Sequence, residues 1–190
     1  MMTLSTPEEN EPQWVQQVLH FWFCELNASG RFTGDAAIDA RIRDRFMLLH
    51  EKLASSEGGE ASQVRPLLAA VIVLDQFSRN MFRGTPRAFA TDATARNLAR
   101  QAITNHPDSN LNREERYFLY LPFEHSEDRA DQALAVRLIS QLGSTEWTNY
   151  ALAHQQLIDR FGRFPHRNTI LGRESSAEEI AAMNEPMGSF

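Results

Sequence analysis

Cysteine, lysine and long apolar runs are nearly missing from this chain of 190 residues, and each shortage excludes a class of protein. Cys24 is the only cysteine, so the chain has no internal disulfide and cannot hold a metal in a cluster of thiolates. The longest apolar run, "PLLAAVIVL" from Pro66 to Leu74, is far shorter than the roughly 20 residues that cross a bilayer, so we expect a buried helix. The N-terminus has neither the basic nor the apolar region of a signal peptide. These absences predict a cytoplasmic protein without a membrane partner.

Sequence motifs for cofactors and common catalytic centres are also missing. The chain has no glycine-rich phosphate loop, no GxSxG nucleophile turn and no HExxH metal motif. Its net charge is -6, and Lys52 is the only lysine among 19 basic residues. Because proteins bind nucleic acids largely by neutralising phosphates, we do not expect this acidic chain to bind them. We also expect no cofactor and no catalytic metal.

Apolar residues recur every three or four positions along almost the whole chain, which is the pattern of amphipathic helices. No stretch shows the sustained alternation and hairpin turns of paired strands. The sequence therefore predicts a single all-α domain over residues 1–190, with about 1–11 and 184–190 frayed, built from stacked antiparallel helical hairpins or a bundle. The expected helices cover about residues 12–26, 35–54, 64–82, 86–105, 112–122, 126–143 and 145–161, and a short eighth helix follows residue 175.

Capping residues predict where several helices begin and end. Side chains that can accept hydrogen bonds from the first backbone N–H groups stand before five expected helices: Asp35, Asn112 with Glu115, Ser126, Thr145, and Ser175 with Glu178. Gly162 is suited to end the seventh helix, because glycine readily adopts the left-handed conformation. Pro122 is expected to end or kink the fifth helix.

A polar set occupies the end of the third expected helix. In "LDQFSRNMFR", Asp75 and Arg79 are four residues apart with the acid first, which favours a helical ion pair, and Arg83 continues that face. Gln76 and Asn80 form a second polar pair beside them. The pattern fits an exposed ion pair at a helix end. The wholly apolar turns before it favour a binding site or a structural clamp instead.

His154 lies on the expected apolar face of the seventh helix, between Ala151 and Ile158. A polar ring at that position points into the core. It can be a core histidine satisfied by one hydrogen bond, or an acid, base or ligand donor in an internal cleft. We predict that it is largely buried and lies within reach of polar groups from "DQFSRN" or "PFEHSED".

The segment "PFEHSED" places Glu124 and His125 before the expected start of the sixth helix. A favourable interaction of acids with the first turn of a helix therefore does not explain them. They could hold a metal only if His154 or His166 converged on them, and no metal-motif spacing supports this. We treat both as candidate ligand-binding residues and not as metal ligands.

The segment "FGRFPHRNTILGR" concentrates positive charge near the end of an acidic chain. Arg160 and Arg163 suit the negative C-terminal end of the seventh helix, and Pro165 stiffens the residues after it. These roles leave four polar residues unexplained: His166, Arg167, Asn168 and Arg173. We predict that the charge of this segment is directed inward, partly against Asp75 and Glu124 and partly toward an anionic ligand.

Four long segments carry a resemblance that covers the chain from about Val18 to the closing "MGSF": "VLHFWF", "LDQFSRNMFRGTPRAFATD", "YLPFEHSED" and "RFGRFPHRNTILGRESSAEE". They resemble a bacterial family known as domain of unknown function 924. The resemblance implies an all-α fold similar to tetratricopeptide-repeat proteins, a right-handed superhelix of helical hairpins, and no particular activity. Polar positions typical of the family fall on Asp75, Gln76, Arg79, Asn80, Arg83, Glu124, His125, His154, Arg163, His166, Arg167, Asn168 and Arg173. Ser78 departs from the pattern, which has proline there, so we expect a different local kink.

Three functions are compatible with this polar set. The first is a small-molecule binder or enzyme whose cleft presents arginine, histidine and asparagine to a phosphate or carboxylate. The second is an interaction module that clamps an acidic peptide in a groove. The third is an internal network that only fixes helix packing. A deep pocket would favour the first, a long open groove the second, and complete mutual pairing without a cavity the third.

Overall fold

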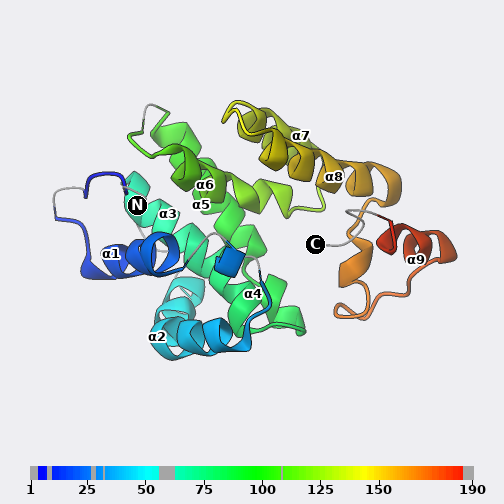
Figure 1. Ribbon diagram of the computed structural model, residues 1–190, viewed down its shortest axis with the longest axis horizontal. Coiled ribbons are helices and arrows are strands. Elements are labelled where there is room, and N and C mark those ends of the chain that lie inside the picture. Colours follow the sequence, from blue (N-terminus) through cyan, green and yellow to red (C-terminus); the bar gives the residue numbers. More distant parts are fainter. Residues whose placement is uncertain are drawn as a thin grey trace. The chain divides into compact units, whose positions relative to one another are not determined.

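The computed structural model describes residues 4–7, 10–26, 29–31, 33–55, 63–107 and 109–185 of the chain (Figure 1). Regular structure throughout these residues is helical, and none of them belongs to a strand. This confirms the predicted all-α fold class. Of the ends expected to be frayed, residues 1–3, 8–9 and 186–190 lie outside the described residues.

The chain folds into two compact units. The first consists of Met1–Arg83 and Arg87–Leu119, and the second of Gly84–Pro86 and Tyr120–Phe190. Helix α6 (Arg113–Glu124) contributes its first residues to the first unit and its last residues to the second. Whether the whole chain folds as a single domain stays a prediction.

The first two predicted helices lie where the apolar pattern placed them. α1 (Gln13–His20) continues without a break into the π-helical turn η1 (Phe21–Glu25). Together these two elements match the helix expected over 12–26. α2 (Ala36–Ser55) begins after Asp35, whose Oδ1 accepts a hydrogen bond from the Ala37 N–H at 2.7 Å. The predicted cap is therefore confirmed.

The third predicted helix is continuous but has three parts. α3 (Val64–Val71) leads into the π-helical segment η3 (Ile72–Phe77) and then into the short α4 (Ser78–Met81). Every residue from Leu67 to Leu74 is fully excluded from solvent, as predicted for "PLLAAVIVL". The Ser78 hydroxyl lies 2.8 Å from the Leu74 carbonyl oxygen and donates to it. π-helical segments often occur at functional sites, so the side chains of η3 are of particular interest.

Aromatic rings join the helices of the first unit around Phe77. Its ring centroid lies 5.9 Å from that of Phe21, 5.6 Å from that of Trp22 and 4.8 Å from that of Phe46. Trp22 extends the cluster to Phe118 of α6 at 5.4 Å. Most of these rings meet edge to face, an arrangement that stabilises aromatic pairs beyond their burial.

Two further helices, α5 and α6, belong wholly or partly to the first unit. The helix expected over 86–105 is a 3-10 turn, η4 (Pro86–Phe89), followed by α5 (Asp92–Asn105). At the start of α6, Asn112 Oδ1 accepts the Glu115 N–H at 3.0 Å, and Glu115 Oε2 accepts the Asn112 N–H at 2.8 Å. This reciprocal pair confirms the predicted capping box.

In the second unit, α7 (Arg129–Ser140) and α8 (Thr145–Phe161) pack against each other, and the 3-10 turn η5 (Pro165–Arg167) leads to α9 (Ala177–Met183). Pro122 does not end α6, which continues two residues further to Glu124.

Three of the predicted caps are wrong by one or two residues. Asp128, and not Ser126, caps α7, because its carboxylate accepts the N–H groups of Ala130 and Asp131. Ser126 instead donates to Asp131 Oδ2 at 2.8 Å. Ser144 caps α8 in place of Thr145, which is the first helical residue.

The capping box of α9 uses Ser176 with Glu179, and not Ser175 with Glu178. Both pairs have the same spacing, and the extended backbone of Ser176 decides between them. Gly162 ends α8 in the left-handed conformation with φ 70°, as predicted.

Candidate functional site

The polar side chains of η3 and α4 form ion pairs inside the first unit. Arg79 Nη1 lies 3.1 Å from Asp75 Oδ1, so the predicted helical pair is confirmed. The same guanidinium binds both carboxylate oxygens of Asp92, the first residue of α5, at 3.0 and 3.1 Å. Burial alone would lower the pKa of Arg79, but Asp75 and Asp92 raise it above its ordinary value. Arg79 therefore holds the end of the third helix against α5.

Gln76 Nε2 donates to Asp75 Oδ2 at 2.6 Å, and Asp39 of α2 is the partner of the remaining predicted residues of this unit, Asn80 and Arg83. Its carboxylate accepts two hydrogen bonds from Arg83, at 2.7 and 2.9 Å, and one from Asn80 Nδ2 at 2.7 Å. Burial would raise the pKa of Asp39, but the bonds from Arg83 and Asn80 lower it overall. The arrangement is a clamp between helices, and these three hydrogen bonds to Asp39 form without a ligand.

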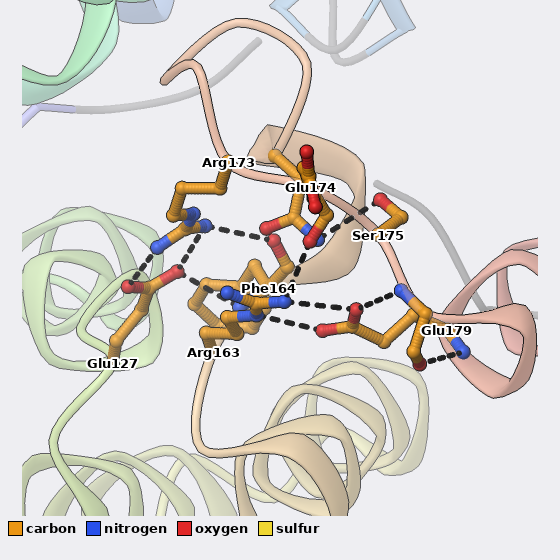
Figure 2. Close-up of polar contacts among 9 residues, drawn as sticks. Glu127, Arg163, Phe164, Arg173, Glu174, Ser175 and Glu179 are labelled. Carbon is orange, nitrogen blue, oxygen red and sulfur yellow. Dashed lines mark hydrogen bonds and ion pairs between the residues drawn. The ribbon is translucent and has the colours of Figure 1, made fainter.

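In the second unit, Glu127 organises the segment that follows α8 (Figure 2). Arg173 binds its two carboxylate oxygens at 2.8 and 2.9 Å, and the Phe164 N–H donates to Oε1 at 2.8 Å. Arg173 Nη2 also donates to the Phe164 carbonyl oxygen at 3.2 Å. Burial would raise the pKa of Glu127, but Arg173 and the Phe164 N–H lower it. Both polar groups of the Phe164 backbone are thus held by one ion pair.

A second ion pair ties the end of α8 to the start of α9 (Figure 2). Arg163 binds Glu179 through Nε and Nη2 at 2.7 and 3.0 Å, and Glu179 also accepts the Ser176 N–H at 2.8 Å. The Arg163 bonds and the Ser176 N–H lower the pKa of Glu179 to about 2. We expected Asp75 and Glu124 as the acids that face this segment. For Arg163 and Arg173 that expectation is wrong, since the chain after α8 turns back to acids at the starts of α7 and α9.

The ring that these ion pairs fix in place is the meeting point of three polar side chains. Phe164 is fully buried, and the Arg167 guanidinium lies over its ring at 4.5 Å from the centroid. The rings of His154 and His166 each lie 5.5 Å from the same centroid. Arg167 is itself only 6% exposed. One aromatic side chain therefore brings together residues that the sequence places on α8 and on η5.

His154 occupies the position that its place on α8 predicted. It is 5% exposed, its Nδ1 lies 2.9 Å from the Tyr150 carbonyl oxygen and 3.3 Å from Glu124 Oε1, and its ring lies 6.3 Å from that of His125. The pKa of His154 is lowered to about 3, chiefly by burial; the hydrogen bond to the Tyr150 carbonyl opposes this, and His125, Arg167 and His166 add to the lowering. A neutral ring whose Nδ1–H donates to Tyr150 carries its lone pair on Nε2.

Asn168 fixes the turn that carries Arg167. It is fully buried, and its Nδ2 donates to Ser175 Oγ at 3.0 Å. Its carbonyl oxygen accepts the Arg173 N–H at 2.8 Å. Within the described part of the chain its side-chain Oδ1 has no hydrogen-bond partner. Asn168 therefore fixes the shape of the loop, and the buried acceptor that remains is its own Oδ1.

Comparison with known proteins accounts for nearly the whole chain. Residues 18–187 match the model of a family described as "Bacterial protein of unknown function (DUF924)". The chain belongs to this family. A solved structure of a protein of unknown function from Agrobacterium tumefaciens is similar to it, with 37% sequence identity and a TM-score of 0.80, covering 90% of this chain and 97% of that one. No curated protein matches the chain.

The polar residues that the sequence analysis singled out thus divide between two settings. Five lie in the clamps of the first unit, namely Asp75, Gln76, Arg79, Asn80 and Arg83, and in the second unit Arg163 and Arg173 form clamps of their own. The rest gather near Phe164 or in the turn beside it: Glu124, His125, His154, His166, Arg167 and Asn168.

Sequence reasoning missed the acids that complete the clamps, namely Asp39, Asp92, Glu127 and Glu179. Each stands at or near a helix start, where an acid is already favoured by the helix dipole, so nothing local distinguished them. Among the described residues, no group of three or more His, Cys, Asp or Glu side chains is arranged to hold a metal ion. No helix of that part of the chain has the length and apolar character needed to span a membrane.

Proposed function

We propose that the second unit binds a small anion, a phosphate or a carboxylate, at Arg167 with His125, His154 and His166. The observation that carries this proposal is the convergence of Arg167, His154 and His166 on the buried ring of Phe164. A guanidinium stacked on an aromatic face keeps its planar edge of donors in a fixed direction, which suits the paired oxygens of phosphate or carboxylate.

The ion pairs around the site support this division of roles. Arg163 and Arg173 each bind both oxygens of one carboxylate, so in our proposal they position the loop and do not touch the ligand. Binding groups that are held by such surrounding contacts lose little freedom when a ligand arrives. A network that existed only for packing would have no need to gather an arginine and two histidines on one ring.

Electrostatics favours an anion over a neutral ligand at this place. The pKa of His154 is lowered first by burial and also by His125, Arg167 and His166, which means that these groups surround it with positive potential. Glu124 is the acid beside His154, with 3.3 Å between Oε1 and Nδ1. An anion bound at Arg167 would lie among cations and potential cations and would offset their mutual repulsion.

Replacing Arg167 tests the proposal directly. We expect inorganic phosphate to bind the wild-type chain in calorimetry and to raise its melting temperature, and Arg167→Gln to remove both effects while circular dichroism stays unchanged. Arg137→Gln, at an exposed arginine of α7 in the same unit, is the matched control and should bind phosphate like the wild type. Equal phosphate responses of wild type and Arg167→Gln would leave the polar set with a structural role only.

We further propose that the hairpins stack as in tetratricopeptide-repeat proteins and that the protein works in the cytoplasm. The packing of α7 on α8 through the four-residue connection 141–144 supports the first point, since such hairpins are the repeating element of these superhelices. The single cysteine supports the second. A crystal structure and fractionation of cells that express the chain would test them.

A further inference from the structure

A cleft of about 380 Å³ lies in the first unit, and none of the clamp residues or the neighbours of Phe164 lines it. Its walls come from the N-terminal segment at Ser5 and Thr6, from the start of α3, and from residues 105–107 and 109–111 between α5 and α6. The volume falls at the lower end of the range typical of small-molecule sites, so its occupant would be small.

Arg65, the one charged side chain among the described residues of the lining, already has partners for its donors. It is 2% exposed, and Nε and Nη2 donate to the two carboxylate oxygens of Glu11 at 2.5 and 3.3 Å. Nη1 donates to the carbonyl oxygen and the hydroxyl of Ser5, each at 2.6 Å. A guanidinium with these partners does not offer the fork that binds a phosphate or carboxylate.

A second buried acid makes the surroundings of Arg65 negative. Glu115 Oε1 lies 3.7 Å from Arg65 Nη1, and Glu115 is fully buried. Two carboxylates, Glu11 and Glu115, therefore face one guanidinium, which disfavours an anion nearby. Neither acid lines the cleft, and Glu115 accepts hydrogen bonds from Ser5 and Asn112. Nothing in the lining therefore attracts a cation directly.

What the cleft offers is a set of neutral polar groups beside apolar ones. His106 lines the cleft, and its ring carries a solvent-excluded Nε2 that has no hydrogen-bond partner within the described part of the chain. Hydroxyl and amide groups come from Thr6, Ser109, Asn105 and Asn110. A ligand hydroxyl can both donate and accept, so it satisfies His106 Nε2 in either tautomer of the ring and matches the amides and hydroxyls around it.

Apolar side chains complete the lining and limit the class of ligand further. Val64, Pro107 and Leu111 line the same cleft as these polar groups. A sugar or cyclic polyol has C–H faces that pack on such side chains and hydroxyls that reach the polar ones. We infer that this cleft binds a neutral polyhydroxy compound of about the size of a monosaccharide.

Ligand-observed saturation-transfer NMR on the full chain tests this inference, with D-glucose and myo-inositol each at about 10 mM, a concentration that reveals millimolar affinity. We expect transfer to at least one of the two compounds, and loss of most of that signal in His106→Phe, which removes the ring nitrogens. Asn110→Ala changes an exposed lining residue and should weaken the signal without affecting folding, so it decides the matter if His106→Phe does not fold. His20→Phe, at an exposed histidine of the same unit, is the control and should keep the wild-type signal.

Three results would overturn the inference: no transfer to either compound, transfer that persists in the folded variants of the cleft, or displacement of the bound compound by equimolar phosphate or putrescine. The last would mean that the cleft selects charge. Arg167→Gln should leave the transfer signal unchanged, because it lies in the second unit and belongs to the anion proposal. Failure of one proposal is therefore distinguishable from failure of the other.

Discussion

Glu127 and Arg173 close a bidentate ion pair around the backbone of Phe164, with one partner bonded to its N–H and the other to its carbonyl oxygen. The concentration of arginine after α8 thus has a defined use. It fixes a buried aromatic ring whose neighbours are Arg167, His154 and His166. Arg163 and Arg173 form ion pairs that hold the loop, and Arg167 belongs to the candidate site.

We predict that Arg173→Gln destabilises the protein by about 1–3 kcal/mol, because it leaves a half-buried carboxylate and a backbone carbonyl without their charged donor. Urea unfolding measures the change in free energy. The matched control is Arg129→Gln in the same unit, where the arginine and Asp159 are 70% and 60% exposed and 3.9 Å apart. It should cost less than about 0.5 kcal/mol. Similar losses in the two variants would contradict the role of the clamp.

The free energy of unfolding should fall as the pH drops below the pKa of a free histidine, because His154 stays neutral in the folded chain. Its pKa is lowered from 6.5 to about 3, so between these values the unfolded state binds a proton that the folded state does not. The free energy of unfolding then decreases by about 2 kcal/mol between about pH 7 and pH 5 from this residue alone. The carboxylates of Glu127 and Glu179, whose pKa values are lowered from 4.5, contribute only at lower pH.

The measurement for this prediction is urea unfolding of wild type and His154→Asn at several pH values in buffers without phosphate. Asparagine keeps a donor for the Tyr150 carbonyl but cannot titrate, so its stability should vary less over this range. His50 is also buried with a lowered pKa, and it contributes equally to both proteins. Parallel curves for the two proteins would show that His154 is protonated in the folded chain.

The sequence predicted the helices and the burial of His154, but it missed the acids that pair with the arginines. The apolar period placed His154 on the buried face of α8, and the reciprocal bonds of Asn112 and Glu115 follow from their spacing alone. The partner of Arg173 could not be read in this way, since Glu127 is 46 residues distant and looks like an ordinary first-turn acid. Ser175 and Ser176 have the same spacing to a glutamate, so the sequence alone could not show which of them caps α9.

A double-mutant cycle on Asp75 and Arg79 should reveal strong coupling. Arg79→Gln is expected to cost about 3–5 kcal/mol, because it leaves the fully buried Asp75 carboxylate without its ion-pair partner. Asp75→Asn in the Arg79→Gln background should then cost much less than it does alone. Urea unfolding of the four proteins gives the coupling, and additive losses would mean that the pair acts as two independent surface charges.

Phe164→Leu tests the role of the aromatic ring independently of the ion pair that holds the Phe164 backbone. Leucine keeps a buried apolar side chain and leaves the backbone bonds to Glu127 and Arg173 in place, but it removes the aromatic face beneath Arg167. A desolvated cation–π contact contributes about 2 kcal/mol, and its loss would also free the guanidinium to move. We therefore predict that the affinity for phosphate falls by at least about tenfold in calorimetry.

The comparison variant for this prediction is Phe77→Leu, which removes an equally buried ring from the aromatic cluster of the first unit. Both variants should lose stability, because each replaces a phenylalanine in a packed interior. Only Phe164→Leu should weaken phosphate binding, since only that ring orients Arg167. If both variants bind phosphate as the wild type does, the position of Arg167 on Phe164 serves packing alone, and the anion must be held elsewhere.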